Sequence, residues 1–248
     1  MYHYYYDGDF DGLLSVVFES YKHRKELGRI SAEPEQLAFD TSEIYVATDV
    51  DKARRVEKYL REKFSYQFFA DLQACFLSCE PRKDEIIVRM IFRAMECGEG
   101  ILESVDEYAL QMNKLVRNVL RERHRYLGLL RFREMHDGTL FSTIEPKNNV
   151  LPILLSHFKN RLARERFAIY DKKRNMLAYY DGQRIDLFFT EKVEIKWSDA
   201  ELEYAFLWNV FHKSISIRER QNKKLQQSNL PKYYWRHLVE DMTDGKLG

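Results

Sequence analysis

The 248-residue chain has few cysteines, few prolines and no long hydrophobic run. Its three cysteines, Cys75, Cys79 and Cys97, form an odd set without a paired framework, which is typical of reduced thiols in the cytosol. No apolar segment approaches the roughly 20 residues that cross a bilayer, and the N-terminus shows no basic and apolar leader. The sequence therefore predicts a cytoplasmic protein that makes no membrane contact.

Signatures of several large enzyme classes are also missing. The chain contains no G-x-S-x-G, H-E-x-x-H, phosphate-binding P-loop or G-x-G-x-x-G pattern, and no H-x-E with P-C-x-x-C. The pair Cys75-x-x-x-Cys79 has no third and fourth ligand at a usual spacing, so we expect two helix cysteines instead of a zinc site. We expect no metal and no cofactor, and these absences leave open whether the chain is an enzyme.

The acidic segment from Asp7 to Gly12, with the sequence DGDFDG, matches the opening of a calcium-binding loop. The match fails at its closing position, where Phe18 stands in place of a bidentate glutamate. The segment therefore predicts a turn whose aspartates cap the following helix.

What the chain does have is a large apolar content and an uneven charge. Hydrophobic residues make up 45% and aromatic residues 14%, which is enough for a substantial core. The net charge is +1, but residues 1–51 carry eleven acids and four bases, whereas residues 212–237 carry seven bases and one acid. This asymmetry predicts an anionic partner for the basic segment, and the alternative is that the two segments face each other within one fold.

The first half, residues 1–126, is predicted to be helical and poor in strands, with an opening of strand, turn and helix. Residues 2–6 form an aromatic strand that ends at a turn, and residues 44–47 form a second short strand. Helical periodicity recurs after each of them. Further helices are expected over residues 50–64, 68–77, 84–95 and 104–126.

The second half, residues 127–248, has the shorter period of strands. The Asp137-Gly138 pair predicts a hairpin between residues 127–135 and 139–144. A helix with one apolar stripe follows, and then three short strands over residues 167–170, 176–180 and 184–189. The expected fold is α+β, with a β-β-α-β-β-β antiparallel sheet followed by C-terminal helices, and the two halves could form one continuous domain.

Two helices are predicted after the sheet. Ser198-Asp-Ala-Glu201 has the pattern of a capping box, and the helix that it begins is apolar on all sides, so we expect it to be mostly buried. Pro231 fits the first turn of a final helix that carries Tyr233, Tyr234 and Trp235.

The segment from His212 to His237 mixes bases, amides and aromatics, the combination that neutralises phosphates and stacks on unpaired bases. We expect Trp235 to pack into the core, and whichever of Tyr233 and Tyr234 faces outward to contact a base. The candidate nucleic-acid-binding residues of this segment are Lys213, Arg218, Arg220, Asn222, Lys232 and Tyr234.

A second basic stripe lies on the long helix predicted before residue 126. Its bases recur at i, i+3, i+7, i+10 and i+11 and so share one helix face. They could follow a phosphate backbone, and the alternative is a solvated face neutralised by neighbours such as Glu122. The members of this stripe are Lys114, Arg117, Arg121, His124 and Arg125.

Two catalytic candidates remain. His212 stands among a cation and hydroxyl groups, and Glu145 lies in a polar cluster beside Pro146. Both groups of residues are also typical of helix caps and turns.

Several segments make the chain resemble an uncharacterised family described as "probable DNA metabolism protein". The resemblance spans nearly the whole chain and implies a context of DNA repair or DNA modification. It also implies a radical-SAM partner described as a putative DNA modification or repair enzyme, and similar domains are joined to UdgX-type uracil-DNA glycosylase domains. The chain has no C-x-x-x-C-x-x-C motif, so radical chemistry would belong to the partner. The segments that carry the resemblance are Tyr6-Asp7-Gly8, Gly12-Leu13-Leu14, Arg125–Phe132, Ile144–Pro152, Phe211–Ile217 and Leu230–Trp235.

These observations lead first to the hypothesis of a nucleic-acid-binding accessory protein in DNA repair or modification. An enzyme that acts on a damaged or modified base is the second hypothesis, with His212 as a general acid or base and Glu145 or a neighbouring carboxylate in support. A protein-binding adaptor that makes no DNA contact is the third.

Overall fold

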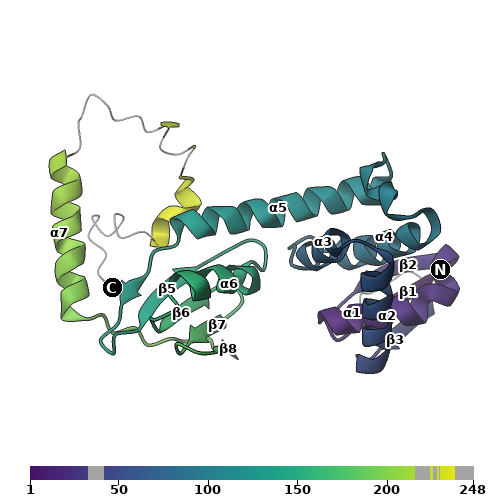
Figure 1. The fold of residues 1–248 in the computed structure, drawn as a ribbon, viewed down its shortest axis with the longest axis horizontal. Helices are drawn as coiled ribbons and strands as arrows, with labels where there is room; N and C mark the ends of the chain where they lie inside the picture. The colour runs from purple at the N-terminus through teal and green to yellow at the C-terminus, as the bar shows by residue number, and fades with distance from the viewer. Residues whose placement is uncertain (33–41, 216–223, 226–227, 229, 238–248) are drawn as a thin grey trace. The chain divides into compact units, whose positions relative to one another are not determined.

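The computed structural model describes residues 1–32, 42–215, 224–225, 228 and 230–237 (Figure 1). The chain divides into two compact units, Met1–Arg121 with Lys147–Asn149, and Glu122–Pro146 with Val150–Gly248. The division falls inside helix α5 (Glu107–Leu129), about one turn before Tyr126. Helices and strands occur in both units, which confirms the predicted α+β class. Within the residues described, no helix combines the length and the apolar character needed to cross a membrane.

The first unit contains a three-stranded parallel sheet in the order β2-β1-β3. Its strands are β1 (Tyr2–Tyr6), β2 (Leu27–Ser31) and β3 (Ser42–Val46). Parallel neighbours need a crossover, and α1 (Phe10–Ser20) provides it between β1 and β2. The sequence pattern missed β2, because the strand includes a glycine and an arginine that interrupt its apolar run.

The helices of the first unit agree with those predicted. They are α1, α2 (Val50–Lys63), α3 (Tyr66–Phe76), α4 (Lys83–Cys97) and most of α5, with short 3₁₀ segments η1 (Tyr21–Glu26) and η2 (Glu99–Glu103). Their apolar faces meet in one core with the sheet, in which Leu13, Leu60 and Phe68 are fully buried. Burial of a side chain of this size stabilises the fold by about 1.5 to 3 kcal/mol.

The second unit contains a five-stranded sheet in the order β4-β5-β6-β7-β8. The strands are β4 (Arg133–Glu134), β5 (Leu140–Ile144), β6 (Phe167–Asp171), β7 (Met176–Tyr180) and β8 (Ile185–Phe189). The predicted hairpin at Gly138 and the predicted β6-β7-β8 meander are present.

Two details of the predicted sheet are wrong. β5 and β6 pair in parallel, because α6 (Leu151–Arg161) lies between them and returns the chain to the same end of the sheet. Residues 127–129 also belong to α5 and not to a strand. Tyr126 and Leu130 are both buried at helical spacing, and the N–H of Leu130 donates to the carbonyl of Tyr126 at 3.0 Å.

Helix α7 (Asp199–Ile215) begins where the capping pattern predicted, and the N–H of Glu201 donates to Ser198 Oγ at 3.0 Å. The Glu201 carboxylate does not reach back to the cap but accepts from Arg133 Nε at 2.8 Å. The predicted burial of α7 is wrong. Its large apolar side chains are 44–70% exposed, because an apolar circumference alone does not supply a surface to pack against. They are Leu202, Tyr204, Phe206, Leu207, Trp208, Val210 and Phe211.

Candidate nucleic-acid interface

The basic stripe of α5 is exposed to solvent, as its spacing predicted. Lys114, Arg117, Arg121, His124 and Arg125 are all exposed, while the other face of the helix packs into the protein. Glu122, the carboxylate named as a neutralising neighbour, is 7% exposed, and its charge acts on Tyr234 together with that of Arg125. The stripe is therefore available to an anionic partner.

The short helix η4 (Lys232–His237) packs against α5 beside this stripe, and Tyr234 forms the contact. Tyr234 is 7% exposed, and its ring centroid lies 5.1 Å from that of Tyr126 in an edge-to-face arrangement. Burial raises the pKa of Tyr234, and a hydrogen bond from the Arg125 guanidinium opposes that shift. The contact fixes Arg125 at the end of the stripe.

Tyr233 is the tyrosine of η4 that faces outward. It is 41% exposed, and its ring stands 5.4 Å from Tyr234 at an interplanar angle of 89°. The prediction that Tyr234 contacts a base is therefore wrong, because Tyr234 is buried and Tyr233 is the tyrosine that faces outward. The sequence could not make this choice, because two adjacent tyrosines differ only in which one the packing covers. Trp235 is partly buried, and its indole N–H donates to the carbonyl of Leu230 at 2.8 Å.

Glu145 lies near the same tyrosines, just after β5. Its backbone N–H donates a hydrogen bond to the Tyr126 hydroxyl oxygen, and its carboxylate lies 3.8 Å from Lys172 Nζ. Burial, and then the charges of Glu122 and Glu145, raise the pKa of Tyr233. The hydroxyls of Tyr126 and Tyr234 therefore accept hydrogen bonds, from the Glu145 N–H and from Arg125.

The polar cluster around Pro146 has a structural role. Arg174 donates to the Pro146 carbonyl at 3.2 Å and to the buried Asp171 carboxylate at 2.9 Å. Asn148 accepts from the N–H of Cys79 at 3.0 Å and so joins the first unit. The turn after β5 is thus held by hydrogen bonds at several points.

The remaining predicted residues have side chains outside the described part of the chain. His212 and Lys213 lie in α7, and Lys232 lies in η4, but their side chains are outside the described part of the chain. Arg218, Arg220 and Asn222 lie outside the described residues altogether. The pairing of His212 with Glu145 in catalysis remains a prediction.

The acidic loop after β1 acts as the predicted capping turn. Asp9 caps α1 by accepting from the N–H of Gly12 at 2.6 Å, and Asp7 accepts from the N–H of Thr48 at 2.7 Å. The hydroxyl of Tyr45 also donates to Asp7, and this hydrogen bond, followed by those from Thr48, lowers the pKa of the carboxyl. Among the residues that the structure describes, no three His, Cys, Asp or Glu side chains gather as metal ligands would.

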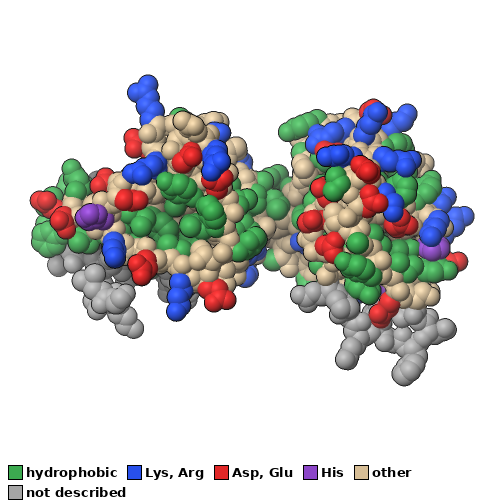
Figure 2. All heavy atoms as spheres, turned by 90° about the horizontal axis from the view of Figure 1, so that it is seen from below, with side chains coloured by type: hydrophobic (Ala, Val, Ile, Leu, Met, Phe, Trp, Pro, Cys, Tyr) green, Lys and Arg blue, Asp and Glu red, His purple; other side chains and the backbone are tan. Residues whose placement is uncertain are grey.

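Both signs of charge alternate with hydrophobic side chains on the face of each unit that Figure 2 presents. Fold and candidate interface together define an α+β protein with an exposed cationic helix face. A family model described as "Domain of unknown function (DUF4130)" matches residues 81–240, which is more than half of the chain, so the chain belongs to this family. The match begins close to α4 and ends beyond η4, so the whole interface lies within it. Neither the curated proteins nor the solved structures gave a match.

Proposed function

We propose that this protein binds nucleic acid through the exposed stripe of α5 and the Tyr233 ring. The observation that carries the proposal is the docking of η4 on α5, since Tyr234 contacts both the exposed Tyr233 and the exposed Arg125. A cation that neutralises a phosphate then stands close to an aromatic ring on which a base can stack.

The proposed ligand is DNA, and the proposed context is DNA repair or modification beside a radical-SAM partner. The support comes from the resemblance to the "probable DNA metabolism protein" family. Three of the segments that carry it contain Tyr126, Glu145 and Tyr234, and these residues meet in one cluster in the second unit.

The test is fluorescence-anisotropy binding of single-stranded and duplex DNA over a series of salt concentrations. A triple variant that changes Arg117, Arg121 and Arg125 to Gln should reduce the slope of log K against log salt by about 2 to 3, because each lost phosphate contact removes roughly 0.7 to 0.9. Its matched control changes three exposed bases of α2, namely Arg54, Lys58 and Lys63, to Gln. Equal slopes for the two variants, or salt-independent binding by the wild type, would contradict the proposal.

A second candidate function, an adaptor that binds a protein partner, is favoured by the exposed apolar side chains of α7. Large exposed apolar areas mark protein-interaction surfaces. Phe206→Glu with Val210→Glu should abolish co-purification with the radical-SAM protein in the absence of DNA, whereas the triple arginine variant should retain it. If both variants co-purify like the wild type, α7 is not the adaptor surface.

A further inference from the structure

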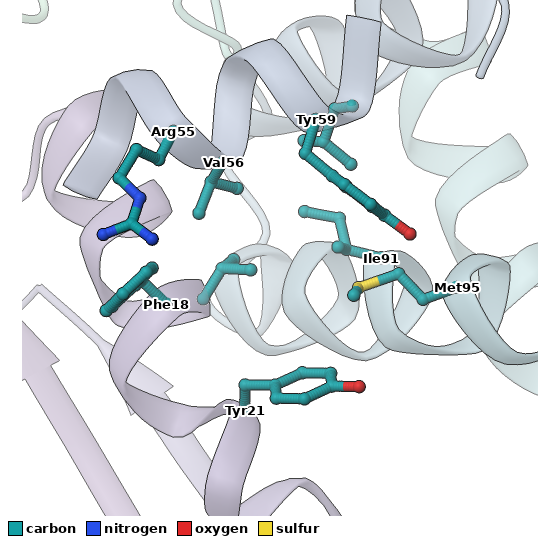
Figure 3. A pocket seen from close by; sticks show the side chains of 9 residues that line it. Phe18, Tyr21, Arg55, Val56, Tyr59, Ile91 and Met95 are labelled. Carbon is teal, nitrogen blue, oxygen red and sulfur yellow. The ribbon is translucent and has the colours of Figure 1, made fainter. Parts of the chain in front are cut away.

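The first unit contains a pocket that takes no part in the interface on α5 and η4. Helices α1, α2 and α4 and the start of η1 surround it (Figure 3). Its volume is about 320 Å³, which lies in the range of small-molecule sites. The floor is apolar and rigidly packed, since Val17, Leu60 and Ile91 are at most 4% exposed.

Three aromatic rings form the walls of this pocket. Phe18, Tyr21 and Tyr59 are 36%, 44% and 37% exposed, an unusual concentration of uncovered aromatic surface around one hollow. Two of them are held by rings behind them, with Tyr21 5.8 Å from Phe92 and Tyr59 6.3 Å from Phe64 between centroids. The walls are therefore in place before any ligand arrives.

The polar groups of the pocket stand at its two ends. Figure 3 shows the Arg55 guanidinium above Phe18 at one end, with its Cζ 5.2 Å from the ring centroid. The hydroxyls of Tyr21 and Tyr59 point to the other end, near Met95. Among the residues that the structure describes, no carboxylate pairs with Arg55, so the one cation of the lining has an aromatic ring as its partner.

We propose that this pocket binds a small amphiphilic anion, namely a flat aromatic body that carries one carboxylate. The body would lie on the aliphatic floor between the three rings, and the carboxylate would take a bidentate hydrogen bond from Arg55. A nucleotide fits less well, because the floor offers no hydrogen-bonding group to a base edge and a single arginine faces the charge of its phosphates.

The experiment titrates 2-naphthoate into the full chain by calorimetry, without DNA, so that its outcome is independent of the proposed nucleic-acid binding. The wild type should bind 2-naphthoate saturably. Arg55→Gln should weaken binding about tenfold, the usual loss when a charge-assisted hydrogen bond is removed. The neighbouring Arg54→Gln, an exposed side chain outside the lining, should bind as the wild type does. Neutral naphthalene-2-carboxamide should bind the wild type about as weakly as 2-naphthoate binds Arg55→Gln.

A second variant fills the pocket without touching its charge. Val56 is half-buried in the lining, and Val56→Phe should abolish binding while the thermal unfolding temperature confirms that the protein is folded. Unchanged binding by Val56→Phe, equal affinities of Arg54→Gln and Arg55→Gln, or no saturable binding to the wild type would each overturn the proposal.

Discussion

The helices and strands of the first unit pack into one apolar core, whereas α7 and β8 of the second unit leave most of their large apolar side chains exposed. In the first unit, strands and helices share one core that includes Leu115 of α5, which is 7% exposed. In the second unit, Leu207 of α7 is 50% exposed and Phe189 of β8 is 81% exposed. The contrast indicates that the first unit is stabilised by its own core, and that α7 and β8 of the second unit present apolar surface to solvent.

The two units also treat a buried aspartate differently. Asp84 of the first unit is 4% exposed, receives a hydrogen bond from the Tyr6 hydroxyl, and has no hydrogen-bond partner at Oδ1 among the described residues. Asp171 of the second unit is fully buried, and both of its oxygens accept hydrogen bonds, one from backbone N–H groups and one from Arg174. Burial raises the pKa of both carboxyls. Among the described residues, hydrogen-bond donors reach both oxygens of Asp171 but only one oxygen of Asp84.

The largest expected effect tests the difference in apolar burial. Leu115→Ala should lower the free energy of unfolding by about 2 to 5 kcal/mol, because it opens a cavity in a packed core. Leu207→Ala, which removes the same atoms from an exposed helix, should change the free energy by about 0.5 kcal/mol or less. Urea unfolding followed by circular dichroism measures both. Similar losses would show that α7 is covered in solution and would remove the contrast.

A smaller effect is expected at Asp171. Asp171→Asn places an amide N–H₂ against donors and removes a charge-assisted hydrogen bond from Arg174, at a cost of about 1.5 to 3 kcal/mol. Asp181 offers a matched control, since it accepts from two backbone N–H groups in the next turn of the same sheet but is exposed. If Asp181→Asn costs as much as Asp171→Asn, burial is not what distinguishes the two turns.

The two tyrosines of η4 separate binding from stability. Tyr233→Ala should weaken single-stranded DNA binding by about 1 to 3 kcal/mol, the usual contribution of a stacked base, and leave the unfolding temperature unchanged. Tyr234→Phe should cost about 1 kcal/mol of stability, because it removes the hydrogen bond from Arg125. Anisotropy and thermal unfolding are measured on both variants. A loss of stability in Tyr233→Ala without a loss of binding would exclude the stacking role.

A pH-dependent effect is expected at Asp84. Burial raises the pKa of Asp84 in the folded state above its ordinary value of 3.8. The contribution of Asp84 to stability is therefore fully present below pH 3.8 and is lost as the pH rises from there through the folded-state pKa. Asp84→Asn should abolish this decline and stabilise the protein at neutral pH, by about 1.4 kcal/mol for every pH unit that separates the folded-state pKa from the ordinary one. Tyr6→Phe should deepen the decline, because the Tyr6 hydrogen bond opposes the rise in the pKa of Asp84. Urea unfolding over a pH series would refute the assignment if the wild type and Asp84→Asn gave parallel profiles.

Local sequence signals predicted most of the elements, because they depend on neighbours in the chain. Ser198 and Asp9 begin helices where their caps indicated, and Gly138 marks the hairpin turn. The strand β2 was missed because Gly28 and Arg29 break its pattern, and its pairing with β1 shifts register at these two residues. Its pairing partner, and not its own composition, makes it a strand.

The candidate interface was predictable in part. The spacing of Lys114 to Arg125 identified an exposed helix face, since helical geometry alone brings residues at i, i+3 and i+7 to one side. The same reasoning could not choose Tyr233 over Tyr234, nor detect the pocket at Arg55. Both features arise where helices distant in the sequence come together.

By itself, the sequence determined the α+β class, the helix caps and the amphipathic stripe of α5, because periodicity and capping act over a few residues. Tertiary structure alone decided the parallel pairing of β5 with β6, the exposure of α7 and the burial of Tyr234. Each of these depends on whether a second surface covers the first, and no pattern within one segment carries that information.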